Sequence, residues 1–224
     1  MRIKINNVYV DIDVSQTTVR QVAPVVMSKS PVLEHLPSYW QEKFNNLLLS
    51  KADMFATSMT DLGQTTVAKH VITTEGPPIY LPPYRVTQAH KTAIAGQIKE
   101  ILDGGIIRPS NSPYSAPIIM VSKKDGRSRM VVDYRKLNAQ TRKDRYPLPR
   151  IDETIDSLHG AKIFSTLDLF SGFYQIELDE SSKSKTAFVT PNGQYEFNRL
   201  PMGLCNSPAT FQRCLNIVLR PLVH

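Results

Sequence analysis

Asp168 is the residue whose setting most clearly suggests chemistry, because it directly follows the short apolar run Phe164–Leu167. A carboxylate at the end of a buried strand is costly unless a positive group meets it. A metal ion is one such group, and phosphoryl transfer is a reaction that commonly needs one. The backbone carbonyl of Leu169 is also available to a hard cation. A helix N-cap or a salt-bridged structural acid is the alternative, and it is preferred for an aspartate taken alone.

The residues directly after Asp168 suggest how a phosphorylated ligand would be held. Ser171 and Gly172 predict a tight turn whose backbone N–H groups could bind a phosphate, although most tight turns bind nothing. Phe173 and Tyr174 could form a floor under a sugar or a base, and the alternative is that one ring packs in the core and the other at its rim.

A second group of candidate residues is cationic. Residues 117–134 predict a β-hairpin that turns at Asp125-Gly126, with Lys123 and Arg129 facing each other across its tip. Two cations so placed could clamp a triphosphate, the arginine in a bidentate way and the lysine as a point charge. Solvated hairpin charges without a ligand are the alternative.

The positive charge of the chain is concentrated around this hairpin. The window Val121–Arg150 holds ten basic and three acidic residues, a net charge of +7, whereas the rest of the chain holds 17 of each. A concentrated positive surface is suited to following a phosphate backbone. A solvated basic surface with no partner is the other interpretation.

Composition limits the class of protein. The 224 residues are 41% hydrophobic and 21% charged, which is ordinary for a globular chain with one large or two small domains. No apolar run approaches the roughly 20 residues of a membrane span, and the start has no secretory signal, so we expect no membrane partner. Cys205 and Cys214 lack metal-site spacing and suggest reduced thiols in an intracellular, cytoplasmic protein, with the nucleus as the alternative compartment.

The patterns predict helices and hairpins without a regular βαβ alternation. Apolar spacing predicts helix within 37–61, and the four prolines of 76–85 predict an extended segment. A further helix would be capped by Thr87 and stopped by Gly104-Gly105. The remaining predictions are a helix that buries Ile151, Ile155 and Leu158, a hairpin over 185–200, and a last helix capped by Ser207, begun by Pro208 and buried along Phe211, Leu215, Val218, Leu219 and Leu222. This mixture indicates an α+β fold.

Four ordered blocks of the sequence resemble the reverse transcriptase of Gypsy-class LTR retrotransposons. The blocks are GIIRPSNSPYSAPIIMVSKKDGRSRMVVDYRKLN (105–138), YPLPRIDETID (146–156), FSTLDLFSGFYQIELDE (164–180) and RLPMGLCNSPATFQR (199–213). The resemblance covers about residues 75–224. Residues 40–74 look like the segment that joins protease to polymerase in such Gag-Pol polyproteins, and residues 1–36 match nothing named.

This resemblance implies a right-hand polymerase, that is, fingers and an incomplete palm of antiparallel hairpins packed with helices. The implied domains are a leader of unknown structure (1–36), a connecting segment with its Pro-rich stretch (37–82) and a truncated reverse transcriptase domain (83–224), with fingers at 83–142 and 176–206 and palm at 143–175 and 207–224.

The resemblance also implies functional residues. Asp168 would be the first catalytic, Mg²⁺-binding aspartate, with the carbonyl of Leu169 beside it, and Phe173 would be the steric gate that favours a deoxynucleotide over a ribonucleotide. The implied nucleotide-binding residues for a dNTP substrate are Lys123, Arg129, Ser171, Gly172, Phe173 and Met202. Those implied to contact an RNA or DNA template with its primer are Arg135, Asn138, Gly203 and Pro208.

One motif of the family does not occur in these 224 residues. Tyr-x-Asp-Asp, which supplies the other metal-binding carboxylate, is absent, as are the sequences of the remaining palm, the thumb, the connection, RNase H and integrase. Asp168 alone does not hold two Mg²⁺ ions about 4 Å apart. We therefore expect the isolated chain to be inactive as an RNA-directed DNA polymerase, and weakly stable or self-associating. A non-catalytic nucleic-acid-binding module and a truncated retroelement remnant are the alternatives.

Overall fold

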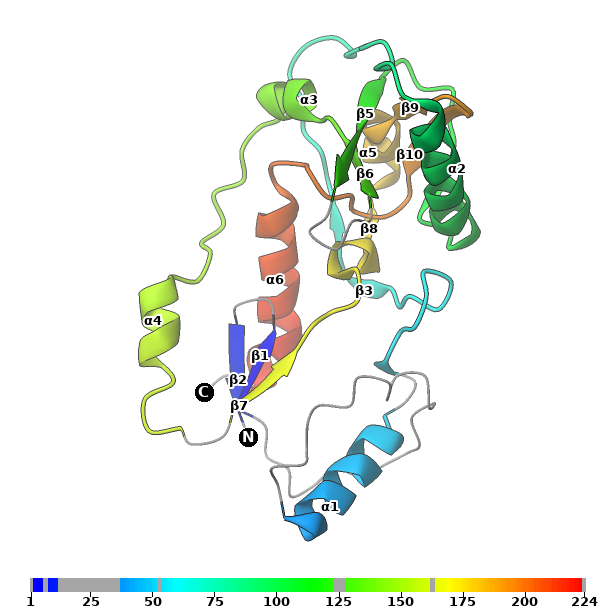
Figure 1. The fold of residues 1–224 in the computed structure, drawn as a ribbon. Helices are drawn as coiled ribbons and strands as arrows, with labels where there is room; N and C mark the ends of the chain where they lie inside the picture. Colours follow the sequence, from blue (N-terminus) through cyan, green and yellow to red (C-terminus); the bar gives the residue numbers. More distant parts are fainter. Residues whose placement is uncertain are drawn as a thin grey trace. The chain divides into compact units, whose positions relative to one another are not determined.

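The computed structural model describes residues 2–5, 8–11, 37–51, 54–122, 128–161 and 164–222 (Figure 1). The chain forms two compact units, which are described separately. Unit 1 comprises Met1–Asp61, Pro149–Phe170 and Pro221–His224, and unit 2 comprises Leu62–Leu148 and Ser171–Arg220. Both units mix helices with strands, so the predicted α+β class is confirmed.

Unit 2 is organised around a five-stranded sheet with the strand order β4-β10-β9-β5-β6. These strands are β4 (Ile107–Pro109), β5 (Ala116–Ser122), β6 (Ser128–Val132), β9 (Phe188–Thr190) and β10 (Gly193–Phe197). β5 and β6 pair antiparallel, as do β9 and β10, which confirms both predicted hairpins. β5 and β9 pair in parallel and join the two hairpins into one sheet. The predicted turn at Asp125-Gly126 lies outside the described residues.

Aromatic and β-branched side chains form the core of this sheet. Phe188 is fully buried and lies against the rings of Tyr195 and Phe197, with centroid separations of 6.0 and 5.2 Å. Ile106 and Ile107, at the start of the edge strand β4, are also buried. Such residues suit a pleated surface that is covered on one side, which is why the hairpins form where the sequence predicts them.

Helix α2 (Gln88–Asp103) packs against β4 and β6 of this sheet. Its stripe of Ile94, Ile98 and Ile101 is buried, as the helical spacing predicts. The predicted cap is confirmed, because the Thr87 hydroxyl accepts a hydrogen bond from the backbone N–H of His90 at 3.4 Å. The helix ends at Gly104.

A second layer of unit 2 combines two strands and the last long helix. β3 (Thr65–His70) pairs in parallel with β8 (Ile176–Leu178), and α6 (Ser207–Leu219) packs on β3. The N-cap of α6 is Asn206, so the predicted cap at Ser207 is wrong by one residue. The Ser207 hydroxyl instead donates to the carbonyl of Pro201 at 3.0 Å, while Pro208 occupies the first turn as predicted.

The buried face of α6 follows the prediction in part. Phe211, Leu215 and Leu219 are buried, whereas Val218 is 52% exposed and therefore contradicts the predicted stripe. The side chain of Leu222 lies outside the described part of the chain.

Short helices complete unit 2. They are α3 (Arg135–Gln140), α5 (Glu180–Lys183), and the 3₁₀ turns η5 (Gly172–Gln175) and η6 (Ser184–Thr186). A further turn, η7 (Arg220–Leu222), follows α6 where the chain passes from unit 2 into unit 1.

The Pro-rich segment 76–85 forms neither a helix nor a named strand, as predicted, apart from the bridge between Tyr80 and Ser115. Its backbone is fixed to the body of unit 2 at Ser115, which accepts from the N–H of Leu81 at 2.9 Å and donates to the carbonyl of Ile79 at 2.8 Å. Tyr80 is 70% exposed beside this attachment.

Unit 1 contains a three-stranded sheet in the order β2-β1-β7 and two helices. Its strands are β1 (Arg2–Ile5), β2 (Val8–Asp11) and β7 (Phe164–Leu167), and its helices are α1 (Ser38–Leu49) and α4 (Ile151–Asp156). β1 pairs antiparallel with β2 and in parallel with β7. Residues 2–5 and 8–11 of the predicted leader are thus strands, and its residues 12–36 lie outside the described ranges.

One prediction for unit 1 is confirmed and one needs correction. The helix predicted within 37–61 is α1, Ser38–Leu49. In α4, Ile151 is 74% and Ile155 is 59% exposed, so their predicted burial is wrong. The reason is that apolar spacing identifies one face of a helix but does not supply a surface to cover it.

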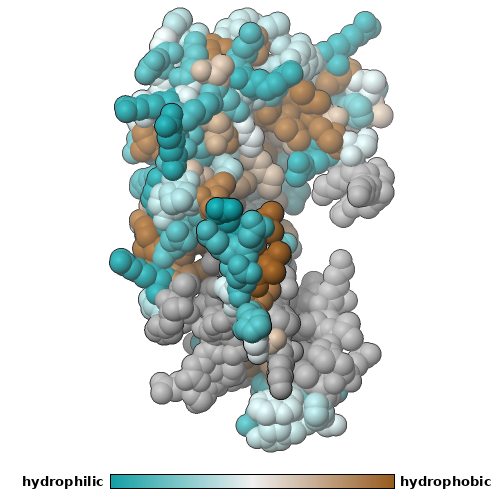
Figure 2. Space-filling view, turned by 90° about the vertical axis from the view of Figure 1, so that its left-hand side faces the viewer, coloured by the Kyte–Doolittle hydropathy of each residue, from teal (hydrophilic) through white to brown (hydrophobic). Residues whose placement is uncertain are grey.

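Apolar side chains also reach the surface elsewhere, among many hydrophilic ones (Figure 2). Large exposed examples are Tyr80, Ile119, Val121 and Met202 in unit 2. Within the described ranges, no helix combines the length and the apolar character that crossing a membrane requires.

Candidate functional site

Asp168 lies immediately after β7, at the end of the strand as predicted, and it is exposed. The desolvation cost of this carboxylate is therefore small, contrary to the expectation from the sequence, and its oxygens are open to solvent. Leu169 is half-buried beside it. No group of three His, Cys, Asp or Glu side chains with metal-site geometry occurs in the part of the chain that the structure describes.

The turn at Ser171 has an unusual backbone. Ser171 adopts the left-handed conformation, with φ 46° and ψ 46°, and among the described residues it is the one non-glycine residue with positive φ. Its carbonyl accepts a hydrogen bond from the N–H of Tyr174 at 2.8 Å, which starts η5 at Gly172. Serine is strained in this conformation by about 1–2 kcal/mol, and such strain is found preferentially at ligand-binding sites.

The two aromatic residues of η5 have different surroundings. Phe173 is half-buried and meets Phe211 of α6 edge-on, with ring centroids 5.1 Å apart. Tyr174 stacks on Phe197 of the sheet core at 6.1 Å, and burial raises the pKa of its hydroxyl to about 12. Both rings are half-buried, and they differ in what they contact: Tyr174 packs on the sheet and Phe173 packs on α6.

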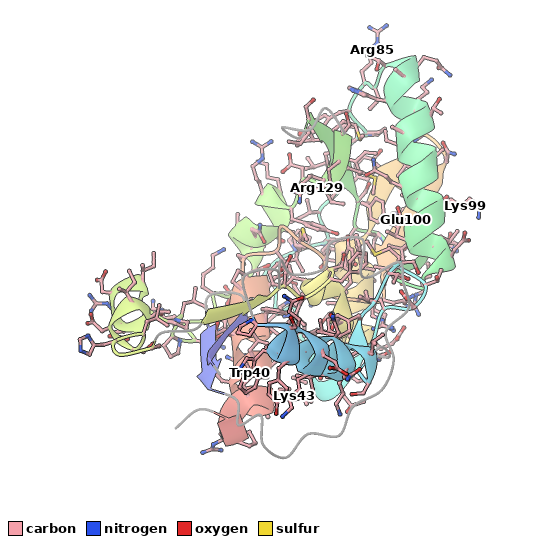
Figure 3. The ribbon with its side chains drawn as sticks, turned by 60° about the horizontal axis from the view of Figure 1, so that its bottom comes forward. Trp40, Lys43, Arg85, Lys99, Glu100 and Arg129 are labelled. Atoms are coloured by element: carbon pink, nitrogen blue, oxygen red, sulfur yellow. The ribbon has the colours of Figure 1, made fainter. Side chains whose placement is uncertain are left out.

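Arg129 and Met202 lie side by side, although 73 residues separate them in the sequence. The Nη1 atom of Arg129 is 3.7 Å from the sulfur of Met202, which is 41% exposed. Arg129 pairs with Val121 across the hairpin, and it has no carboxylate partner among the described residues. Figure 3 labels Arg129 on its strand and Glu100 on α2. Lys123, its predicted companion, lies outside the described residues.

Arg135, the predicted template contact, begins α3 and is tied to the end of the hairpin. Its guanidinium donates two hydrogen bonds to the carboxylate of Asp133, at 2.8 and 2.6 Å, and remains 79% exposed. Tyr84 donates a further hydrogen bond to the same carboxylate at 3.1 Å. Hydrogen bonding from the Arg135 side chain is the main reason that the pKa of Asp133 is lowered to about 2.

Asn138 joins α3 to the loop that carries Gly203. Its side-chain amide donates to the carbonyl of Gly203 at 2.7 Å and accepts from the N–H of Cys205 at 2.8 Å. Gly203 itself has φ +95°, a conformation that favours glycine. Pro208, the remaining predicted template contact, is exposed at the start of α6.

The segment after α3 presents several exposed cations. Arg142, Lys143 and Arg145 are exposed, whereas the intervening Asp144 is bonded to Arg213 at 2.8 Å. That guanidinium, with smaller contributions from other groups, lowers the pKa of Asp144. Because the acid already has a basic partner in α6, the three cations retain a net positive field.

Two positioning side chains escaped the sequence analysis. Asn206 donates to the carbonyl of Arg142 at 2.8 Å and accepts from the N–H of Asp144 at 3.1 Å. Gln97 of α2 contacts both neighbours of Arg129 in β6. The sequence does contain a sign that Gln97 has a special role. It lies three residues after Ile94, where a polar residue interrupts the apolar face of the helix.

Residues 121–224 match the protein family described as reverse transcriptase (RNA-dependent DNA polymerase). The chain is 46% identical over 198 residues to the retrovirus-related Pol polyprotein from transposon 297 of Drosophila melanogaster, covering 86% of this chain and 19% of that protein. It is 41% identical over 146 residues to the enzymatic polyprotein of cauliflower mosaic virus (strain Strasbourg), covering 63% of this chain and 22% of that protein. The chain thus spans about a fifth of the length of these curated relatives.

Solved structures of the prototype foamy virus protease-reverse transcriptase have a similar fold. A selenomethionine-labelled CSH mutant superposes with a TM-score of 0.73 at 26% identity, covering 91% of this chain and 28% of that one. The foamy viral protease-reverse transcriptase in complex with an RNA/DNA hybrid gives a TM-score of 0.76 at 23% identity, covering 92% and 28%. Because the identity to the RNA/DNA hybrid complex is only 23%, that similarity concerns the fold alone.

Proposed function

We propose that this chain, of which residues 121–224 match the reverse transcriptase family, forms the fingers and part of the palm of an RNA-directed DNA polymerase. The reaction would add a deoxynucleotide to the 3′-hydroxyl of a primer, as directed by an RNA or DNA template. The observation that carries this proposal is the 46% identity over 198 residues to a retrotransposon Pol polyprotein. The domain assignment of 83–142 and 176–206 to fingers and of 143–175 and 207–224 to palm belongs to the same proposal.

Asp168 would bind Mg²⁺ together with the carbonyl of Leu169. Both groups offer oxygen atoms, which Mg²⁺ prefers, and the carboxylate is exposed. Sites that handle phosphates commonly bind Mg²⁺ through one or two carboxylates plus substrate phosphates and water, so a single carboxylate from this chain fits such a site. When bound, the ion would supply positive charge for the oxygens of the transferring phosphoryl group.

Arg129 and Met202 would meet the incoming nucleotide, with Lys123 as a second cation. The guanidinium of Arg129 offers N–H donors for phosphate oxygens, and the neighbouring thioether supplies an apolar surface for the sugar. The N–H groups of the Ser171-Gly172 turn would hold the phosphates, and only two residues separate Ser171 from Asp168 in the sequence.

Phe173 would select the sugar. Its ring is held edge-on by Phe211, so it resists displacement by a larger ligand. A ribose 2′-hydroxyl that meets this ring would be excluded, whereas a deoxyribose would fit.

Arg135, Asn138, Gly203 and Pro208 would lie along the template. Support comes from the bond that joins Asn138 to the Gly203 loop and from the exposed guanidinium of Arg135. Because Asn138 has two backbone partners, its contribution would be to hold the loop, and Arg135 would contact the phosphates directly.

The test exchanges the matching segment of the transposon 297 polyprotein for this chain and measures primer extension on a homopolymer RNA template with Mg²⁺ and a dNTP. We expect extension, and we expect Asp168→Asn to lower its rate by about a thousandfold or more. Asp103→Asn is the matched control, because Asp103 is an exposed carboxylate at the end of α2 and should leave the rate unchanged. Undiminished extension by Asp168→Asn would contradict the proposal.

A non-catalytic nucleic-acid-binding module is the second candidate, favoured by the net charge of +7 in Val121–Arg150. In that case the exchanged polyprotein would not extend primers, while the 224-residue chain would bind nucleic acid with an affinity that falls steeply with salt. Binding that is independent of salt would remove this candidate.

A further inference from the structure

Among the described residues, β6 is the outermost strand of the five-stranded sheet, and one of its edges has no strand beside it. The backbone N–H and C=O groups at such an edge need other partners. This edge is significant because β6 carries Arg129, the cation proposed to bind the triphosphate. The direction of that side chain depends on the backbone that holds it.

The side-chain amide of Gln97 occupies this edge. Its Nε2 atom donates to the carbonyl of Ser128 at 2.9 Å, and its Oε1 atom accepts from the N–H of Met130 at 2.9 Å. A primary amide carries an NH2 group that donates and a carbonyl oxygen that accepts, and both are attached to the same carbon atom. Gln97 therefore takes the place that a neighbouring strand would fill.

The two backbone groups that Gln97 binds belong to the residues on either side of Arg129. Fixing both peptide groups restricts φ and ψ of Arg129, and with them the direction of its Cα–Cβ bond. Beyond that bond, the guanidinium lies against the sulfur of Met202 at 3.7 Å. The strand edge and the Met202 contact thus restrain the two ends of the same side chain.

Gln97 is itself held in place by its helix. Ile94, Ile98 and Ile101, on the same side of α2, are all buried, with exposures of 0, 4 and 7%. α2 packs against β4 as well as β6, so rotation of the helix would disturb both contacts. The amide is therefore presented to β6 from a rigid element.

We propose that Gln97 is a positioning residue, which orients Arg129 toward the triphosphate of the incoming nucleotide. This inference rests on the proposed function, because Arg129 gains its role from it. Gln97 has no contact with the nucleotide in this account and acts through the backbone of β6. A residue that only stabilised the sheet edge would affect unfolding but not the triphosphate affinity of the folded chain.

The test uses the full 224-residue chain and its affinity for the magnesium complex of a dNTP in the presence of template–primer. Gln97→Glu keeps the acceptor for the N–H of Met130, but it replaces the donor to Ser128 with an oxygen that the Ser128 carbonyl repels. We expect this variant to bind the dNTP about tenfold more weakly. Gln97→Leu, which lacks both groups, should weaken it at least as much. Gln88→Leu is the matched control, since Gln88 is an exposed glutamine in the first turn of the same helix and should leave the affinity unchanged.

A double-mutant cycle with Arg129→Ala decides between positioning and stability. If Gln97 acts through Arg129, Gln97→Glu should cause no further loss of affinity once Arg129 is alanine. A further tenfold loss in that background would overturn the inference, as would unchanged affinity in the single variant. The urea midpoint of each variant identifies any loss of affinity that is due to unfolding.

A second readout separates this inference from the proposed function. The side-chain Nε–H resonance of Arg129 in an NMR spectrum should shift in Gln97→Glu and Gln97→Leu but not in Gln88→Leu, with no nucleotide present. An unshifted resonance would overturn the positioning claim. If the resonance shifts and the exchanged transposon 297 polyprotein does not extend primers, the proposed function fails while the control of Arg129 by Gln97 stands.

Discussion

The two units of this chain differ in how their helices are supported. In unit 2, α2 and α6 bury apolar stripes against strands, and every buried apolar side chain of the described residues lies between Ile72 and Leu219. In unit 1, α1 and α4 bury no residue. Helices of 12 and six residues gain little stability from propensity alone. Unit 2 is therefore expected to carry most of the measurable folding free energy.

Removing a core ring should produce the largest loss. Phe188→Ala leaves a cavity between Tyr195, Phe197 and the backbone of the sheet, and we expect it to lower the free energy of unfolding by about 3–5 kcal/mol. Urea unfolding measures this loss. Phe188→Leu keeps most of the volume and should cost about 1 kcal/mol. An alanine variant as stable as the leucine variant would contradict the view that this cluster holds unit 2 together.

The second largest effect concerns a buried histidine of unit 2. His70 is 2% exposed and shares a hydrogen bond of 2.7 Å with the hydroxyl of Thr210. Burial is the main reason that its pKa is lowered to about 4, with Asp144 opposing and Arg213 reinforcing the shift. Between pH 4 and the unfolded value of about 6.5, the unfolded chain binds the proton more readily, so stability falls as the pH falls.

This linkage should cost about 2 kcal/mol at pH 5 relative to pH 7.5. Urea midpoints at the two pH values measure it, and His70→Gln should remove most of the difference. The carboxyl of Asp133, whose pKa is about 2, titrates below this window and does not contribute to it. A difference that persists in full in His70→Gln would show that another group is responsible.

The sequence predicts local features of unit 2 better than its long-range contacts. The predicted ends of α2 are confirmed because Thr87 and Gly104 cap the helix through contacts within one turn of the chain. The bond between Asn138 and Gly203 spans 65 residues, and no local pattern encodes it. The two hydrogen bonds from Gln97 to the residues beside Arg129 are also long-range contacts, because they depend on where α2 packs.

The candidate site likewise contains some features that the sequence predicts and others that it does not. The strand that ends just before Asp168 follows from a short apolar run, and the nucleotide-binding roles proposed for Arg129 and Met202 follow from the resemblance to a family. The left-handed backbone of Ser171 could not be predicted, because serine carries no preference for that conformation. Nor could the exposure of Ile151 and Ile155, since helical spacing is the same whether or not another surface covers the face.

A smaller effect is expected at the start of α2. Thr87→Ala removes the acceptor for the N–H of His90 and should lower the free energy of unfolding by about 1 kcal/mol. Thr87→Ser keeps the hydroxyl and should restore most of the loss, both measured by urea unfolding. Equal stability of the alanine and serine variants would mean that tertiary packing alone fixes this end of the helix.

The smallest effect is expected in unit 1, and it tests the comparison most directly. Ile155→Ser replaces an apolar side chain that is 59% exposed, so little buried area is lost and the free energy of unfolding should change by less than about 0.5 kcal/mol. Ile98→Ser in α2, at a position that is 4% exposed, makes the same chemical change in unit 2 and should cost several kcal/mol. Equal losses in the two variants would mean that α4 is covered in solution, and the contrast between the units would then fail. Concentration-dependent sedimentation of the wild-type chain, reduced in Ile155→Ser, would identify a second copy of the chain as that cover.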